Sequence, residues 1–163
     1  MNDEPDHKAP FKGYAGEDRP LGAYLVLLGL FQLVFALFLL LMKGSDRSIP
    51  QRVRLGDIVL FGMATHKLSY LVSNDAVTSP IRAPFTEFQE MQSPSNVEEQ
   101  ARGKGLRRAV GELLICVFCL GQWIAAFFAY GLVFAPALTR FVASIFAMLT
   151  LSDFLHQAYM KIR

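Results

Sequence analysis

The two cysteines of the chain, Cys116 and Cys119, are the residues whose types and spacing point most directly to chemistry. A separation of three residues places both sulfur atoms on one face of a helix, with Glu112 about one turn earlier as a candidate proton or metal partner. A dithiol at a helix start gains thiolate character, as redox Cys-x-x-Cys pairs do, and two thiolates are half of a tetrahedral zinc site. The simplest interpretation is that both cysteines pack a helix interface.

Two polar residues near the carboxyl end are further candidate partners of the cysteines. In an antiparallel pair of helices turning at Pro136, residues equidistant from the turn lie at one level, because each helix rises about 1.5 Å per residue. His156 matches Cys116 in this respect, and Asp153 matches Cys119. We therefore regard Asp153 and His156 as candidate proton or metal partners, with solvation of a helix end as the simpler interpretation.

Two other places in the sequence carry candidate functional residues. His66 and Lys67 lie inside an apolar stretch and form a candidate buried polar site, because ionisable residues in membrane helices usually face the interior of a bundle. The alternative is that Lys67 extends to the interface. The loop with Pro80, Arg82 and Pro84 is either a contact for lipid headgroups or a protein partner, or a structural loop. No established metal or phosphate motif occurs in the sequence, so no metal is assigned.

The composition indicates a membrane protein. Of the 163 residues, 53% are hydrophobic and only 18% are charged, and the mean hydropathy is +0.33. An ordinary soluble domain of this length is less apolar. The 16 Lys and Arg nearly balance the 14 Asp and Glu, so a nucleic-acid partner is not expected. Two cysteines are too few for the disulfide scaffold of a small secreted protein.

The distribution of apolar segments predicts an all-α integral membrane protein with three or four transmembrane helices. Residues 1–20 read as a disordered polar tail and residues 21–163 as one membrane domain. The first apolar segment is long enough to cross a hydrocarbon core of about 30 Å and too long for a cleavable signal peptide. The expected helices are 23–42, 58–72, 106–134 and 138–160.

The middle and last segments complete the predicted topology. Whether residues 58–72 span is left open, because the segment is short and Lys67 at its centre costs about 3 kcal/mol. Residues 86–105 are polar and predict a solvated linker. The last two helices are expected to form an antiparallel hairpin that turns at residues 135–137.

Basic residues predict the orientation in the membrane. With four spans, the side that holds residues 73–108 carries ten Lys and Arg against five on the other side. If 58–72 does not span, the count still places residues 73–108 inside. Because loops rich in Lys and Arg stay in the cytoplasm, we expect the 73–108 loop there and the protein in a bacterial cell membrane.

Three blocks of sequence resemble a known family. They are H-K-L-S-Y-L at 66–71, D-A-V-T-S-P-I-R-A-P-F at 75–85 and G-E-L-L-I-C-V-F-C-L-G-Q-W at 111–123. Together they look like the signature of a bacterial family of small membrane proteins classed as domain of unknown function 1360. The resemblance covers roughly residues 57–156 and implies a polytopic membrane protein with no established activity. Val117 stands where the family usually has proline, which weakens the analogy to soluble thiol oxidoreductases.

These observations favour an assembly or interaction component, in contact with the lipid bilayer and with a protein partner or a second copy of the chain. Catalysis is left open, and a non-catalytic role is favoured. The alternative is a membrane thiol redox or thiol-metal protein that uses the cysteine pair with Asp153 and His156. Zinc or a quinone would be the cofactor only in that alternative, and no cofactor is otherwise assigned. A small transporter is the third hypothesis.

Overall fold

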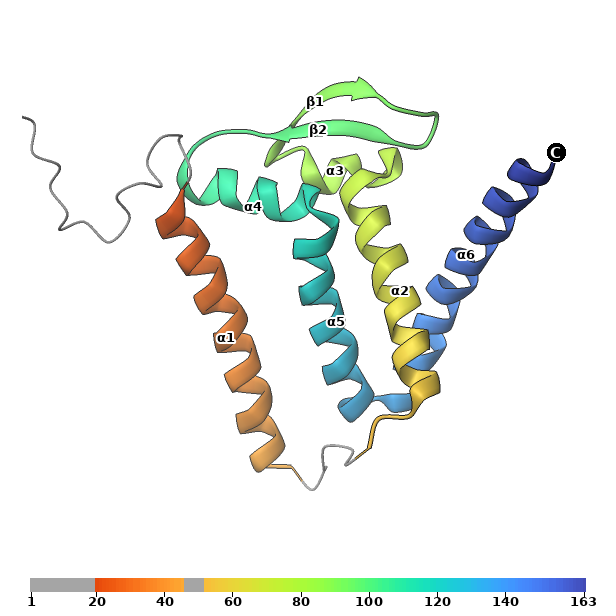
Figure 1. Ribbon diagram of the computed structural model, residues 1–163. Helices are drawn as coiled ribbons and strands as arrows, with labels where there is room; N and C mark the ends of the chain where they lie inside the picture. The colour runs from red at the N-terminus through yellow and green to blue at the C-terminus, as the bar shows by residue number, and fades with distance from the viewer. Residues whose placement is uncertain (1–19, 46–51) are drawn as a thin grey trace, which may run out of the picture.

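The computed structural model describes residues 20–45 and 52–163. Within them, long helices run alongside one another, and a shorter helix and a β-hairpin cover one end (Figure 1). The long helices are α1 (Leu21–Lys43), α2 (Leu55–Asn74), α5 (Val117–Phe134) and α6 (Pro136–Ile162). The elements that connect α2 to α5 are η1 (Ala76–Thr78), α3 (Ser79–Arg82), β1 (Thr86–Met91), β2 (Val97–Ala101) and α4 (Gly105–Ile115). The predicted polar tail lies outside the described residues, apart from Pro20.

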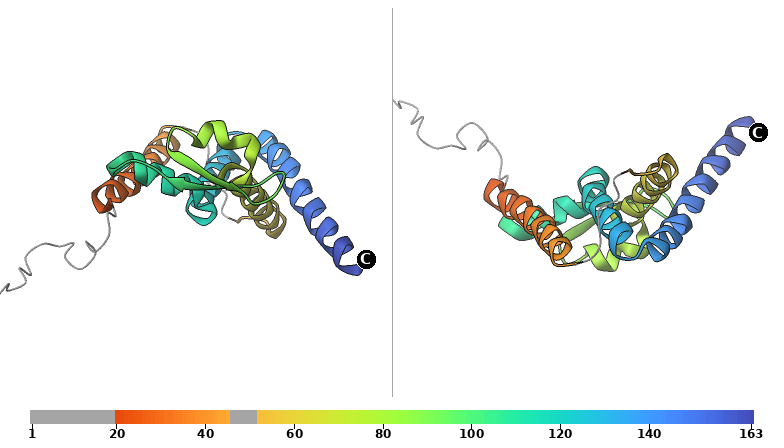
Figure 2. Two further views of the ribbon diagram at one scale, coloured as in Figure 1. Left: turned by 90° about the horizontal axis from the view of Figure 1, so that it is seen from above. Right: turned by 90° about the horizontal axis from the view of Figure 1, so that it is seen from below.

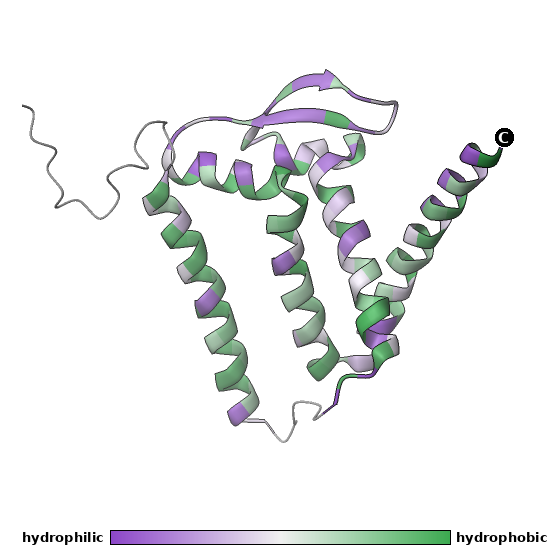
Figure 3. Ribbon diagram, in the orientation of Figure 1, coloured by the Kyte–Doolittle hydropathy of each residue, from purple (hydrophilic) through white to green (hydrophobic). Residues whose placement is uncertain are grey.

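Among the described residues, helices α1, α5 and α6 are long and apolar enough to cross a membrane. Figure 3 shows apolar residues along them and polar residues concentrated in the hairpin. Helix α2 is not among these candidate membrane helices, and Asp57, His66 and Lys67 interrupt its apolar sequence. Of the predicted all-α fold with three or four transmembrane helices, the structure confirms the coarser part, a mostly helical chain with three candidate membrane helices among the described residues.

The surface of α1 is apolar over nearly its whole length. Only Phe38 and Met42 of this helix are buried, whereas Leu33 and Leu40 are 64% and 66% exposed. A soluble monomer rarely exposes a continuous apolar surface of this extent. Hydrocarbon is the environment in which such a surface has no cost.

The core lies where α2 packs between α5 and α6. Ala64, Phe128 and Ala143 are buried together there, one from each helix. Small residues let the helix backbones approach closely, which is the usual basis of helix packing in lipid. Helix α1 leans on α5 through aromatic rings instead, and the ring centroids of Phe38 and Tyr130 are 4.4 Å apart.

The structure corrects the prediction of an all-α fold and of a linker over residues 86–105. Strands β1 and β2 pair antiparallel, in a register from Thr86 opposite Ala101 to Met91 opposite Val97. The sequence did not predict these strands because they are rich in Glu and Gln, which are not typical strand residues. The chain reverses where the backbone amide of Asn96 donates to the carbonyl of Ser93 at 3.2 Å.

The helix predicted over residues 106–134 is in fact two helices. Cys116 has an extended backbone, with φ of −97° and ψ of 100°, and separates α4 from α5. Helix α4 crosses the ends of the long helices, and α5 then runs along the bundle (Figure 1). The break is stabilised by the sulfur of Cys116, which accepts a hydrogen bond from the amide of Cys119 at the start of α5.

The expected close hairpin of the last two helices is not confirmed. Helices α5 and α6 join at Ala135, and Pro136 occupies the first turn of α6, where proline fits well. Beyond this turn α6 packs chiefly on α2. Its carboxyl-terminal half extends away from the other helices (Figure 2), and residues 151–163 are all exposed. Polar contacts between α2 and α6, described below, account for this preference.

Gly111 sets how closely α4 approaches the hairpin. A Cβ atom at this position would lie 2.5 Å from the carbonyl oxygen of Phe85 and 3.0 Å from the Cβ of Ala101. We predict that Gly111→Ala lowers the free energy of unfolding by about 1 to 3 kcal/mol, because the backbone must move apart. Thermal unfolding of the purified protein in detergent measures this loss.

Gly62→Ala is the matched control for this substitution. Gly62 also lies inside a helix, but a Cβ atom added to it would meet nothing within 4 Å. Alanine should be neutral or stabilising there, since it is the better helix former by about 1 kcal/mol. Equal stability of the two variants would contradict the close approach at Gly111.

Candidate functional site

The segment between α2 and β1 folds around one buried arginine. Arg82 has no exposed surface, and its guanidinium donates to the carbonyls of Val72 at 2.6 Å and Asp75 at 3.0 Å. The hydroxyl of Thr78 donates to the carbonyl of Leu71 at 2.6 Å. Carbonyls at the end of a helix lack partners within the helix. This segment therefore caps the carboxyl end of α2.

The same guanidinium forms a double hydrogen bond with Glu99 of β2. Arg82 Nε lies 2.9 Å from one carboxylate oxygen and Nη2 lies 2.8 Å from the other. The hydroxyls of Ser79 and Thr86 donate to the same two oxygens, at 2.9 and 2.7 Å. Paired bonds of this geometry are the strong form of an ion pair. The pair joins the hairpin to the end of α2.

The charge of Glu99 is maintained by these donors. Burial raises the pKa of its carboxyl, because a low dielectric disfavours the charged form. Hydrogen bonds from Arg82, Thr86 and Ser79, with the positive charge of Arg82, lower it by more. The pKa of Glu99 therefore lies below its ordinary value, and the ion pair is complete at neutral pH.

The loop predicted to contact lipid or a partner has one buried and two exposed candidate residues. Arg82 is enclosed and bonded within the chain, so it has no free group to offer a headgroup. Pro80 and Pro84 are exposed. The carbonyl of Pro84 accepts two hydrogen bonds from Arg107 of α4, at 2.9 and 2.7 Å. Any contact made by this loop must use its exposed residues rather than Arg82.

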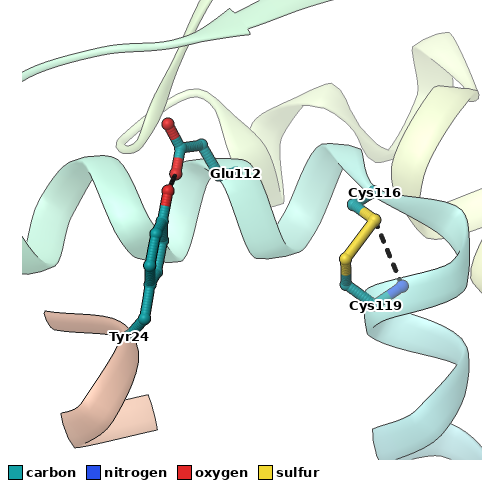
Figure 4. The surroundings of a disulfide bond; sticks show 4 residues. All are labelled: Tyr24, Glu112, Cys116 and Cys119. Atoms are coloured by element: carbon teal, nitrogen blue, oxygen red, sulfur yellow. Dashed lines mark hydrogen bonds between the residues drawn. A yellow bond between two sulfur atoms is a disulfide. The ribbon is translucent and has the colours of Figure 1, made fainter. Parts of the chain in front are cut away.

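The cysteine pair lies at the junction of α4 and α5 (Figure 4). The two sulfur atoms are at disulfide-bonding distance, and the Cα atoms of Cys116 and Cys119 are 5.2 Å apart. Glu112 does not join them. Its carboxylate accepts hydrogen bonds from the Tyr24 hydroxyl of α1 and from Arg108, the latter at 3.0 Å. Glu112 thus connects α4 to α1 and makes no hydrogen bond with the sulfur atoms.

The structure brings Asp153 to Lys67 of α2 rather than to the cysteines. Asp153 Oδ2 lies 2.5 Å from Lys67 Nζ. Within residues 20–45 and 52–163, no group of three or more His, Cys, Asp or Glu side chains is placed to hold a metal ion. The prediction that Asp153 and His156 lie near the cysteines required α6 to pack along α5. Since α6 packs on α2 instead, equal depth does not bring the groups together.

The two polar pairs predicted separately line one cavity between α2 and α6. Its volume is about 550 Å³. Helix α2 contributes His66, Lys67 and Tyr70, and the turn of the hairpin contributes Ser95 and Asn96. Helix α6 supplies the opposite wall, namely Thr150, Asp153, Phe154, His156, Gln157 and Lys161. The amide of Asn96 donates to the Tyr70 hydroxyl at 2.8 Å, which fixes the hairpin over this cavity.

Sequence reasoning missed a second ion pair between the same helices. Arg140 Nε and Nη2 lie 2.8 and 2.9 Å from the two carboxylate oxygens of Asp57. Between the two ion pairs, the hydroxyl of Thr150 donates to the carbonyl of Met63 at 2.9 Å. The sequence does contain a signal for these pairs. Asp57 precedes Lys67 along α2, and their partners Arg140 and Asp153 follow one another in the same order along α6. Pairing those opposite charges would have placed α6 against α2.

Comparison with known proteins assigns the chain to a family. A family described as "Protein of unknown function (DUF1360)" matches residues 60–159. The chain belongs to this family. The match includes the capping segment, the cysteine pair and most of the α2–α6 contact, and it confirms the resemblance read from the three sequence blocks.

One curated relative is named for a biological process. Over 73 residues the chain is 37% identical to the sporulation protein YjcA of Bacillus subtilis (strain 168). The matched part is 43% of this chain and 62% of that protein, so the chain spans less than two thirds of the relative's length. No solved structure matches the chain.

Because the pKa of Glu99 is lowered on folding, we predict that acid weakens the attachment of the hairpin. The stabilisation is complete above the unfolded pKa of 4.5 and is lost as the pH falls through the lower folded pKa. Protection factors of the β2 backbone amides, measured by hydrogen exchange from neutral to acid pH, report this loss. Glu99→Gln should abolish the pH dependence, and Glu87→Gln, at an exposed position of β1, should retain it. A pH dependence that survives Glu99→Gln would contradict the assignment.

Proposed function

We propose that this chain is a multi-pass bacterial membrane protein that acts as an assembly or interaction component rather than as a catalyst. In this proposal α2 is a fourth span beside α1, α5 and α6. Its 20 residues reach about 30 Å, the thickness of a hydrocarbon core. Its charged residues, Asp57 and Lys67, are each paired with a residue of α6. Such pairing is how ionisable groups are accommodated inside a bundle.

The main support for the proposal is that two large apolar side chains of β1 remain exposed although the hairpin is fixed to the bundle. Toward the bundle, Arg82 and Glu99 are bonded to one another and fix the strands. In the register of the hairpin, Phe88 lies opposite Glu99, and Met91 lies opposite Val97. Both side chains therefore project from the same face of the hairpin as Glu99. They are nevertheless 58% and 53% exposed, on a strand that is otherwise polar. Aromatic residues and methionine are enriched where proteins meet. A firmly held hairpin that presents such residues is suited to binding a protein partner.

We base the proposed orientation on the basic residues. The last two helices would cross the membrane in opposite directions and place the turn at Ala135 on the face opposite to the hairpin. The excess of Lys and Arg on the hairpin side favours a cytoplasmic location for it. The partner would then be met at the cytoplasmic surface of the membrane.

The setting that we propose is spore formation, because the relative in Bacillus subtilis carries the name of a sporulation protein. The alternative of a thiol redox or thiol-metal protein is not supported. The cysteines lie at disulfide-bonding distance, but Glu112 and Asp153 are engaged with other residues of the chain. We therefore assign the cysteine pair to the junction of α4 and α5.

Spore formation in Bacillus subtilis lacking the related sporulation protein tests the role of the hairpin. The intact chain should restore spore yield, and Phe88→Glu should abolish the rescue while the protein still accumulates in the membrane. Loss of an aromatic contact at the centre of an interface costs about 2 kcal/mol or more in binding. The doubly substituted Cys116→Ser, Cys119→Ser chain should behave as wild type, because serine retains an acceptor at the start of α5.

The opposite pattern would contradict the proposal. If the serine variant accumulates normally but fails to restore spores, and Phe88→Glu succeeds, thiol chemistry rather than the hairpin carries the function.

The proposed topology is tested by labelling introduced cysteines in a chain with Cys116 and Cys119 replaced by serine. Ser95→Cys lies at the exposed turn of the hairpin, and Ala137→Cys lies at the exposed start of α6 on the opposite face. In intact cells an impermeant maleimide should label position 137 and not position 95. After the cells are opened, both should react. Labelling of position 95 in intact cells would reverse the orientation.

A further inference from the structure

The cavity between α2 and α6 has donor groups that the protein itself does not use. Of its two acids, Asp153 is paired with Lys67, and Asp75 accepts a hydrogen bond from the amide of Val77 at 3.0 Å. In the described part of the chain, the side chains of His156 and Lys161 have neither a hydrogen bond nor an ion pair. The acids of the cavity are thus satisfied, and its unpaired ionisable side chains are basic. A ligand that completes this cavity carries negative charge.

The position of the cavity indicates what kind of anion fits. It opens beside the last turns of α2, under the hairpin, at the end of the bundle where a span would leave the hydrocarbon. Phe154 of the same wall is 66% exposed, and Leu155 and Tyr159 nearby are 64% and 62% exposed. Apolar surface therefore adjoins the basic groups. A molecule with a phosphate and an acyl chain meets both kinds of surface at once.

We propose that this cavity binds the phosphate of an anionic phospholipid headgroup, held by Lys161 and His156, with the acyl chain against the exposed face of α6. Basic pockets between membrane helices are a known form of lipid recognition. The inference rests on the proposed location in a membrane and is independent of the proposed partner at the hairpin. A bound lipid would fill the space where α6 diverges from α2 and would hold the end of α6 in place.

Lipid retention by the full-length protein tests the inference. The protein is placed in nanodiscs of phosphatidylcholine with a minor fraction of phosphatidylglycerol, and the lipids that remain bound after extraction into mild detergent are counted by native mass spectrometry. Wild type should retain phosphatidylglycerol in preference to phosphatidylcholine. Lys161→Gln should reduce that preference about fivefold, since one basic residue near a membrane surface contributes about that much. His156→Gln should reduce it further.

Arg163→Gln is the matched control. It removes the same charge two residues beyond Lys161, at a position that does not line the cavity. It should leave the preference for phosphatidylglycerol unchanged. Equal loss in the Lys161 and Arg163 variants would show a general attraction of anionic lipid to the basic end of α6, and would overturn the inference.

Inorganic phosphate separates the two possible sources of the anion. Added at millimolar concentration, it should not displace phosphatidylglycerol, because it lacks the acyl chain. Displacement by phosphate alone would assign the cavity to a soluble phosphate compound and would overturn the lipid assignment. The spore assay gives an independent result, so Lys161→Gln can lose lipid while Phe88→Glu alone loses the partner.

Discussion

The buried ion pair between Arg82 and Glu99 is the interaction on which the end of the bundle depends. One guanidinium serves two purposes, because it caps the last carbonyls of α2 and grips the carboxylate of β2. A charged pair removed from water is stable only if all of its donors and acceptors are satisfied. Ser79 and Thr86 supply the remaining bonds to Glu99. The conspicuous segment at residues 75–85 is therefore explained by the folding of this end.

A second set of polar contacts decides how the long helices associate. The ion pairs of Asp57 with Arg140 and of Lys67 with Asp153 fasten α2 to α6 at two levels. Apolar contacts alone discriminate weakly among partners inside lipid, because the lipid is equally apolar. These charges direct α6 toward α2 and away from α5 after the turn. The divergence that follows produces the cavity with its free basic groups.

The sequence predicted the helices well and their contacts poorly. Long apolar runs such as that of α1 are set by local composition, so their positions were clear. The β-hairpin was missed because its strands are stabilised by tertiary contacts, including the one between Gly111 and Ala101, and not by strand-forming residues. The cysteines were placed with Asp153 by assuming which helices are neighbours. That choice depends on pairing between distant charges, which periodicity within one segment does not reveal.

Arg82 and Glu99 hold the hairpin on the bundle as one unit, and a double-mutant cycle measures this coupling. The free energy of unfolding of the hairpin end is determined by denaturant titration for Arg82→Met, Glu99→Met and the double variant. Each single change should cost about 3 to 5 kcal/mol, because it leaves a buried charge without its partner. The double variant should lose clearly less than the sum of the two. Single variants as stable as wild type, or strictly additive losses, would show that the two side chains do not act as one unit.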